Sequence, residues 1–234
     1  MIQFYSPDIT STLLLDKEEA SHCVRVLRKK AGDTVYVTDG RGMRYKCLII
    51  EANPHRVRLE IKGEELIPKA WDISVTIAVA PTKNADRMAW LVEKATEIGV
   101  DRIIFLRCRH SERKGINIDR LRRVAVSAMN QSLKTILPVL EEGFSLEAIL
   151  GLKGQRYFGY CDAETERKEF VKEYSGMNDI VIAIGPEGDF SSEEVEAMVK
   201  AGYMPVTFGQ ERLRTETAAL YGLTAAKVLN TLKT

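Results

Sequence analysis

Residues 180–191 read IVIAIGPEGDFS, and this stretch decides the expected class of fold. Its five apolar residues, Ile180 to Ile184, are typical of a strand that is buried on both faces of a sheet. The glycines and the proline after them predict a tight turn. Ser191 and Glu194 then have the spacing of a capping box, which starts a helix. The stretch indicates an α/β sheet whose turn either binds a ligand or only connects the strand to the helix.

A second turn of the same kind follows the expected strand 204–208, which ends at Gly209. A helix is expected after this turn, to about Asn230. The turn and the start of the helix carry two arginines and a glutamate, namely Arg212, Arg214 and Glu216. Charged side chains at such a junction are costly unless they are paired or contact a charged ligand. A surface turn with weak salt bridges is the alternative. We expect the two turns to meet at one edge of the sheet and to form a composite pocket.

The rest of the pattern divides the chain into two domains, residues 1–67 and 71–234. In the first domain, short alternating segments separated by tight turns predict a small β-barrel. Residues 63–69 are expected to form a linker. From residue 71 onward, apolar strands alternate with amphipathic helices, which indicates an α/β domain with a mostly parallel sheet covered on both faces. The expected elements are strands 34–38, 45–50, 56–62, 73–79, 103–106 and 157–160, and helices 84–99 and 121–129.

Composition and cysteine usage are those of an ordinary globular chain. Of its 234 residues, 45% are hydrophobic and 29% are charged, which is typical of soluble domains. No apolar run approaches the roughly 20 residues needed to span a bilayer, and the first residues lack the pattern of a signal peptide. A reducing, cytoplasmic location is expected, because the cysteines form no CxxC pair and indicate neither a disulfide framework nor a zinc site. The cysteines are Cys23, Cys47, Cys108 and Cys161.

Several common enzyme motifs are missing from the sequence. There is no GxxxxGK[ST] phosphate loop, no GxGxxG after a first strand and no GxSxG nucleophile turn. The three histidines, His22, His55 and His110, lie far apart, so no metal centre is expected. His110 stands in a basic segment, where an RNA or surface contact is more typical than a catalytic base.

Charge is unevenly distributed, although the formal net charge is only +1. Residues 102–123 contain eight basic residues and two acids, whereas residues 141–200 contain fourteen acids and six basic residues. Such polarity favours a basic face that contacts phosphates while the whole chain stays near neutral. A solvated helix face is the alternative.

Five segments, taken together, resemble those of one known family. They read IGPEGDF at 184–190, LRTETA at 213–218, KNADRMAWLVEKATEIGV at 83–100, HCVRVLR at 22–28 and DGRG at 39–42. The first two resemble the signature loops of the 16S ribosomal RNA uridine-N3 methyltransferases, the ribosomal RNA small subunit methyltransferase E family of the SPOUT superfamily. The others resemble a helical segment and two N-terminal elements of that family. The segments follow the family's order from near residue 20 to near residue 230.

The resemblance implies a PUA-like barrel followed by a SPOUT α/β domain whose C-terminal chain passes through a deep trefoil knot. It also implies a homodimer that binds S-adenosylmethionine at the knot. The implied reaction transfers the methyl group to N3 of a specific uridine in 16S ribosomal RNA, either free or in the assembled small subunit. Neither a membrane nor a metal is an expected partner. Two alternatives stay open: a SPOUT methyltransferase acting on another RNA base or a ribose, and a non-catalytic RNA-binding module.

The two turns and the resemblance together identify candidate site residues. The cofactor is expected to lie against Ile184, Gly185, Pro186, Glu187, Gly188, Phe208, Gly209, Leu213, Thr215, Thr217 and Ala218. The catalytic candidates are Arg214 and Arg212, which would stabilise charge on the uracil oxygens, and Glu216, which is a candidate base. RNA phosphates are expected to contact Arg25, Arg28, Lys29, Arg109, Arg113, Lys114, Arg122 and Arg123. A Gly185→Val change is expected to abolish cofactor binding, because it blocks the close approach to the backbone.

The sequence departs from the family at three places that bear on the site. In the second turn the family often reads LGxRIL, whereas residues 208–213 read FGQERL. The family commonly reads GPEGG where this chain reads GPEGD, so Asp189 replaces the last glycine. Aspartate is among the less costly substitutes for glycine if the backbone there has a positive φ. In the middle segment the family reads EQSxRxxxP, whereas residues 130–138 read NQSLKTILP. These departures concern fine substrate contacts more than cofactor binding.

Overall fold

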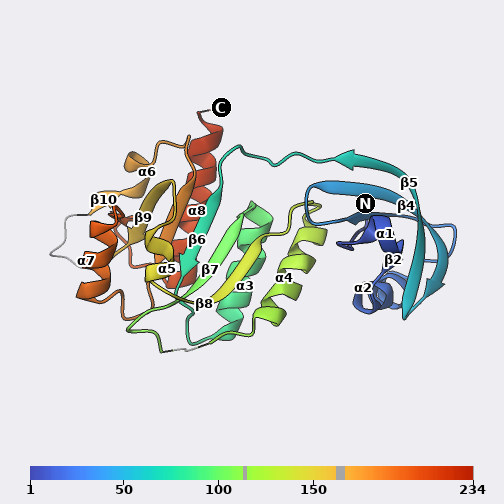
Figure 1. The fold of residues 1–234 in the computed structure, drawn as a ribbon, viewed down its shortest axis with the longest axis horizontal. Coiled ribbons are helices and arrows are strands. Elements are labelled where there is room, and N and C mark those ends of the chain that lie inside the picture. The colour runs from blue at the N-terminus through green and yellow to red at the C-terminus, as the bar shows by residue number, and fades with distance from the viewer. Residues whose placement is uncertain (113–114, 162–166, 234) are drawn as a thin grey trace. The chain divides into compact units, whose positions relative to one another are not determined.

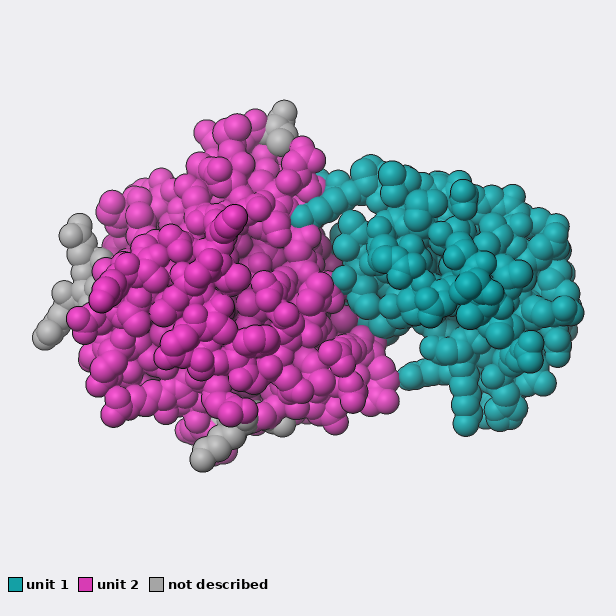
Figure 2. All heavy atoms as spheres, viewed as in Figure 1, with its two compact units in different colours: residues 1–70, 126–137 teal, residues 71–125, 138–234 magenta. Residues whose placement is uncertain are grey.

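The structure, a computed structural model, describes residues 1–112, 115–161 and 167–233. It divides into two compact units, shown in different colours in Figure 2. The first unit comprises residues 1–70 and 126–137, and the second comprises residues 71–125 and 138–234. No helix in the described ranges is long and apolar enough to cross a membrane.

The first unit is built around a mixed five-stranded sheet with the order β1-β3-β4-β5-β2. The strands are β1 (Gln3–Tyr5), β2 (Leu14–Leu15), β3 (Thr34–Thr38), β4 (Met43–Asn53) and β5 (Arg56–Leu66). β1 pairs with β3 in parallel, and the other pairs are antiparallel. The alternating patterns at 34–38, 45–50 and 56–62 correctly predicted β3, β4 and β5. Because β5 continues to Leu66, the expectation that residues 63–66 belong to a linker is wrong.

Short helices complete this unit. They are α1 (Ile9–Thr12), α2 (Lys17–Ser21) and the π-helical turn η1 (His22–Val26), which continues α2. Asp16 caps α2 by accepting a hydrogen bond from the Glu19 N–H at 2.8 Å. The core gathers the buried side chains of the strands and of α2, such as Phe4, Val37 and Leu59.

Residues 126–137 belong to this unit although residues 71–125, which belong to the second unit, separate them from its main part. They include the end of α4 (Ile118–Gln131). The Asn130 side chain donates to Glu19 at 2.9 Å, and the Thr38 hydroxyl donates to the Thr135 carbonyl at 3.2 Å. Burial raises the pKa of Glu19 to about 7. The first unit is therefore assembled from two separate stretches of sequence.

The second unit contains a seven-stranded sheet with the order β10-β12-β9-β11-β6-β7-β8, and every pair in it is parallel. The strands are β6 (Val75–Val79), β7 (Arg102–Arg107), β8 (Val139–Ser145), β9 (Gln155–Gly159), β10 (Lys168–Glu169), β11 (Ile180–Ile184) and β12 (Met204–Thr207). All five residues of β11 are buried, as the apolar run predicted. The sequence did not predict β8 or β10.

Helices cover both faces of this sheet (Figure 1). They are α3 (Ala85–Ile98), α5 (Glu147–Leu150), α6 (Phe170–Glu173), α7 (Ser192–Lys200) and α8 (Thr215–Thr231). Val181 and Ala183 of β11 share a core cluster with Ile149 of α5 and Met198 of α7. α8 packs against α3 and against the strands β6 and β11. The alternating sides of β11 therefore face two different helical layers.

Candidate active site

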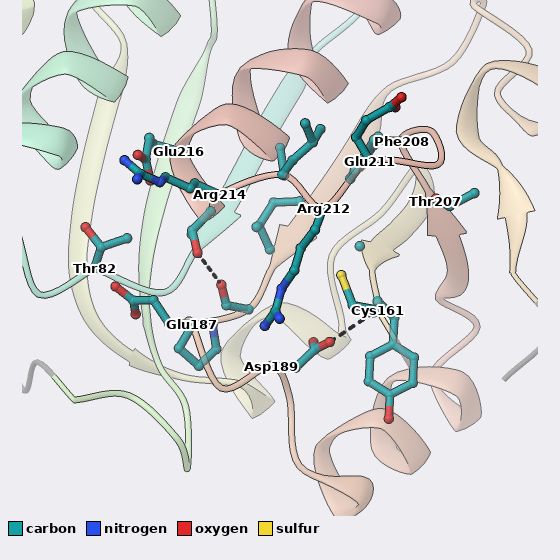
Figure 3. A pocket seen from close by; sticks show the side chains of 18 of the residues that line it. Thr82, Cys161, Glu187, Asp189, Thr207, Phe208, Glu211, Arg212, Arg214 and Glu216 are labelled. Carbon is teal, nitrogen blue, oxygen red and sulfur yellow. Dashed lines mark hydrogen bonds between the residues drawn. The ribbon is translucent and has the colours of Figure 1, made fainter. Parts of the chain in front are cut away.

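Four neighbouring parallel strands, β6, β9, β11 and β12, end at the same edge of the sheet. Ile184 pairs with Val79 on one side and with Gly159 on the other, and Gly159 also pairs with Val206. Beyond these ends lies a cavity of about 270 Å³, shown in Figure 3. The Thr215 hydroxyl, at the start of α8, donates to the Gly185 carbonyl at 3.1 Å. The prediction that the two glycine-bearing turns meet around one pocket is therefore confirmed.

The first turn is held by hydrogen bonds along its own length. Asp189 has a φ of 61°, and its N–H donates to the Pro186 carbonyl at 2.9 Å. The helix after the turn begins as predicted: the Ser191 N–H donates to Glu194 at 2.8 Å, and the Glu194 N–H donates to the Ser191 hydroxyl at 3.3 Å. Phe190 is buried in a core cluster against which Val195 also packs. The turn is thus anchored at its end by α7.

The second turn brings charge to the pocket. Gly209 has a φ of 125°, a conformation that glycine adopts without strain. Arg212 and Arg214 are exposed and line the cavity. Figure 3 shows the Arg212 side chain extending toward Asp189, whereas Arg214 lies beside Glu216. Both arginines are therefore placed to contact a charged ligand or substrate.

Glu216 is the most unusual side chain at the site. The residue is only 5% exposed, and it lines the cavity. Its Oε1 atom lies 3.6 Å from Nε of Arg87, a residue of α3. Its Oε2 atom is buried and has no hydrogen-bond partner among the described residues. A buried carboxylate oxygen without a hydrogen-bond partner is energetically costly. This atom is therefore suited to accept a hydrogen bond from a bound molecule.

A third wall of the cavity was not predicted. It comes from the end of β9 and the residues after it, Gly159, Tyr160 and Cys161, with Thr82 after β6. Asp189 joins this wall to the first turn, because one carboxylate oxygen accepts the Cys161 N–H at 2.9 Å. The signal was available, since residues 157–160 read as a strand and ligands gather beyond the carboxyl ends of parallel strands.

Comparisons with known proteins agree with this architecture. Residues 69–227 match the model of an RNA methyltransferase domain, and residues 15–62 match that of an RNA methyltransferase PUA domain. The chain belongs to the RNA methyltransferase family. A probable rRNA-methyltransferase of Porphyromonas gingivalis has a crystal structure that is 40% identical and covers 100% of both chains, with a TM-score of 0.94.

Two further relatives carry a more specific name. Ribosomal RNA small subunit methyltransferase E of Rickettsia conorii is 26% identical over 223 residues, or 94% of this chain and 91% of that protein. The crystal structure of the Neisseria gonorrhoeae enzyme of the same name, bound to S-adenosyl methionine, is 24% identical and covers 98% of each chain, with a TM-score of 0.85. The predicted resemblance to this family and the predicted fold, a PUA-like unit followed by an α/β methyltransferase domain, are confirmed.

Within this methyltransferase fold, most of the expected cofactor-binding residues line the cavity. These are Ile184, Gly185, Pro186, Glu187, Phe208, Leu213, Thr215 and Ala218. The three catalytic candidates, Arg212, Arg214 and Glu216, also line it. Gly188 and Gly209 line a neighbouring hollow instead. Thr217 is exposed on α8 and does not line the cavity, because the helix turns its side chain away from Glu216 and Thr215. The binding roles themselves stay predictions.

The loop after β7 supports the first turn at the cavity. Nδ1 of His110 lies 3.2 Å from the carbonyl oxygens of both Gly188 and Asp189. Because carbonyl oxygens only accept, Nδ1 must carry the proton. The Arg109 N–H donates to Glu194 at 2.9 Å, and the Arg109 guanidinium pairs with Glu193 at 3.1 Å. His110 therefore has a contact within the protein that the sequence did not predict.

The expected phosphate contacts are spread over both units. Arg25 and Arg28 are exposed and Lys29 is half-buried in the first unit, whereas Arg122 and Arg123 are exposed on α4 in the second. Arg109 and Arg122 form exposed ion pairs with acids. Arg113 and Lys114 lie outside the described residues. Among the described residues no group of three His, Cys, Asp or Glu side chains could hold a metal ion.

Proposed function

We propose that the protein transfers a methyl group from S-adenosylmethionine to N3 of a uridine in 16S ribosomal RNA. The observation that carries this proposal is the cavity between the two turns, with the buried, unpartnered Oε2 of Glu216 on its wall. The membership in the RNA methyltransferase family supports the reaction class. The names of the relatives support ribosomal RNA as the substrate. The choice of uridine N3 rests on the family resemblance.

The cavity suits S-adenosylmethionine in its apolar lining and in its charge. Ile184, Phe208 and Leu213 offer apolar walls, and the turns offer backbone groups that can hold an adenine. Its lining contains four acids and three arginines, a balance that favours a cationic ligand: Glu187, Asp189, Glu211 and Glu216, with Arg87, Arg212 and Arg214. When bound, S-adenosylmethionine supplies an electrophilic methyl group.

The protein must make N3 of uracil nucleophilic, because this nitrogen carries a proton. Glu216 accepts that proton through Oε2, which has no hydrogen-bond partner in the described structure. Arg87 beside Oε1 keeps the carboxylate oriented. Arg214 and Arg212 stabilise the charge that develops on the two uracil oxygens. The uridine must leave its base stack to reach these groups.

RNA binding in this proposal uses both units. Arg25, Arg28 and Lys29 of the PUA-like unit contact phosphates, as do Arg122 and Arg123 of α4. Arg109 contributes less, because its guanidinium is already paired with Glu193. Arg113 and Lys114 keep the role expected from sequence. The trefoil knot and the cytoplasmic location also remain parts of this proposal.

A homodimer is part of the proposal, and α8 offers the surface for it. Its exposed face carries no charge along three turns, with Thr217, Tyr221, Thr224 and Val228 spaced three or four residues apart. Tyr221 is 42% and Val228 51% exposed. A continuous uncharged helix face that contains exposed apolar residues is typical of an interface.

Val228→Glu is expected to convert a dimer into a monomer of 26.3 kDa, measured by light scattering after size-exclusion chromatography. A charge buried without a partner at an interface is strongly unfavourable. Val199→Glu on α7 is the matched control, because Val199 is also 51% exposed. A dimer in both variants, or a monomeric parent, contradicts this assignment of the interface.

The reaction itself is tested by mass spectrometry of ribosomal RNA from a strain that lacks the gene. Loss of 3-methyluridine from the small-subunit RNA, restored by the parent gene, is the expected result. A loss of another methylated nucleoside would favour the alternative SPOUT activity, and an unchanged nucleoside profile would contradict the enzyme. A non-catalytic RNA-binding module would in addition show no affinity for S-adenosylhomocysteine in calorimetry.

A further inference from the structure

Asp189 joins three separate segments of the second unit, two of which line the cavity. It lies in the turn after β11, at the position of the last glycine in the family pattern GPEGG. One carboxylate oxygen accepts the Cys161 N–H at 2.9 Å, and the other accepts the Phe190 N–H at 2.9 Å. Its carbonyl oxygen lies 3.2 Å from Nδ1 of His110. A glycine would reproduce only the last of these contacts.

The backbone at this residue explains why aspartate is tolerated. Its φ of 61° lies in the left-handed region, which aspartate and asparagine enter more readily than most residues. The bond to the next N–H holds the side chain in place. The same side chain then reaches Cys161, 28 residues earlier in the sequence. With aspartate here, the chain loses the conformational freedom of a glycine and gains a hydrogen bond that connects two walls of the cavity.

We propose that Asp189 is a positioning residue that holds the Gly159–Cys161 wall against the cofactor turn, so that the cavity is formed before the cofactor binds. Both connected segments line this cavity. A binding site that is already ordered loses less conformational freedom when its ligand binds. The inference rests on the proposed cofactor, but the link between the two walls exists in the structure without it.

Cys161 provides a direct probe of the link. It is the exposed cysteine of the four, whereas Cys23, Cys47 and Cys108 are buried. Burial raises the pKa of the Cys23 and Cys47 thiols to about 11 and that of Cys108 to about 12, so these three react slowly. The reaction rate of the one exposed thiol, that of Cys161, therefore reports on the wall that Asp189 holds.

The test compares Asp189→Gly and Asp189→Asn with the parent. Glycine accepts the positive φ but removes both carboxylate bonds. Asparagine also accepts this φ and keeps one acceptor oxygen. We expect Asp189→Gly to weaken S-adenosylhomocysteine binding about tenfold in calorimetry, and Asp189→Asn about threefold. In the protein without ligand, Cys161 should react faster with a thiol reagent, and its amide should exchange hydrogen faster, in the same order.

If Asp189 only stabilised the fold in general, Asp189→Gly would lower the melting temperature without this selective change at Cys161. The proposal is overturned if Asp189→Gly is folded and matches the parent in both ligand affinity and Cys161 reactivity. If the parent itself does not bind S-adenosylhomocysteine, the proposed function fails, and the Cys161 measurements alone then decide the role of Asp189.

Discussion

Replacing Glu216 with glutamine is expected to lower kcat about a hundredfold while the affinity for S-adenosylhomocysteine stays within about threefold. Proton removal by a positioned side chain typically contributes 10²–10⁴-fold to a rate. Glutamine has the same shape but cannot take the proton from uracil N3. It also replaces one carboxylate oxygen by an NH₂ group, which donates rather than accepts. The substitution therefore removes the chemistry and leaves the cavity in place.

The measurement is single-turnover methylation of small-subunit RNA at saturating S-adenosylmethionine, combined with calorimetry. Glu211→Gln is the matched control, because Glu211 also lines the cavity but is exposed to solvent. A Glu216→Gln enzyme with the kcat of the parent would exclude Glu216 as the base. A variant that loses ligand affinity at unchanged kcat would instead place this carboxylate against the cofactor.

Local signals in the sequence predicted much of the second unit. Asn84 and Gly99 cap the two ends of α3, as expected. Asn84 accepts the Asp86 N–H at 2.8 Å, and Gly99 has a φ of 111°. The capping box at Ser191 and Glu194 is formed. In each case the deciding contact joins residues less than one turn apart, so the pattern is visible in a few consecutive letters.

Contacts between distant residues could not be predicted in this way. Nothing in residues 126–137 indicates that they pack with the first unit, since the link depends on Asn130 meeting Glu19. The bond from Cys161 to Asp189 and the approach of Arg87 to Glu216 likewise depend on how the strands are ordered in the sheet. Strand order is a property of the whole fold, and the periodicity of single elements does not contain it.

The segments that sequence reasoning missed have weak local patterns. β8 includes two glutamates and a glycine, and only Leu140 of its residues is buried. It lies at one edge of the sheet and pairs with a single neighbouring strand, β7. β10 has two residues, both exposed. Edge strands of this kind lack the continuous apolar run by which β11 was identified.

Gly185→Val is expected to weaken S-adenosylhomocysteine binding more than a hundredfold and to lower the stability of the fold. Besides blocking the ligand's approach to the backbone, the valine side chain would also crowd its neighbours within the protein. A β-carbon at Gly185 would lie 3.2 Å from two ring carbons and from the backbone nitrogen of Phe190. Overpacking of this kind typically costs about 1–3 kcal/mol. Phe190 is 3% exposed and anchors the turn, so it cannot move without disturbing the cavity wall.

Calorimetry and thermal unfolding of three variants separate the two causes. Gly63→Val in β5 is the matched control, because a β-carbon there meets no atom within 4 Å, and valine favours strands. Gly185→Ala adds only the β-carbon and should give an intermediate loss of affinity with a smaller loss of stability. If Gly185→Val folds and binds S-adenosylhomocysteine as the parent does, the backbone of this turn does not contact the cofactor. In that case the ligand must lie elsewhere along the edge of the sheet, even though the Thr215 hydroxyl still joins the two turns at Gly185.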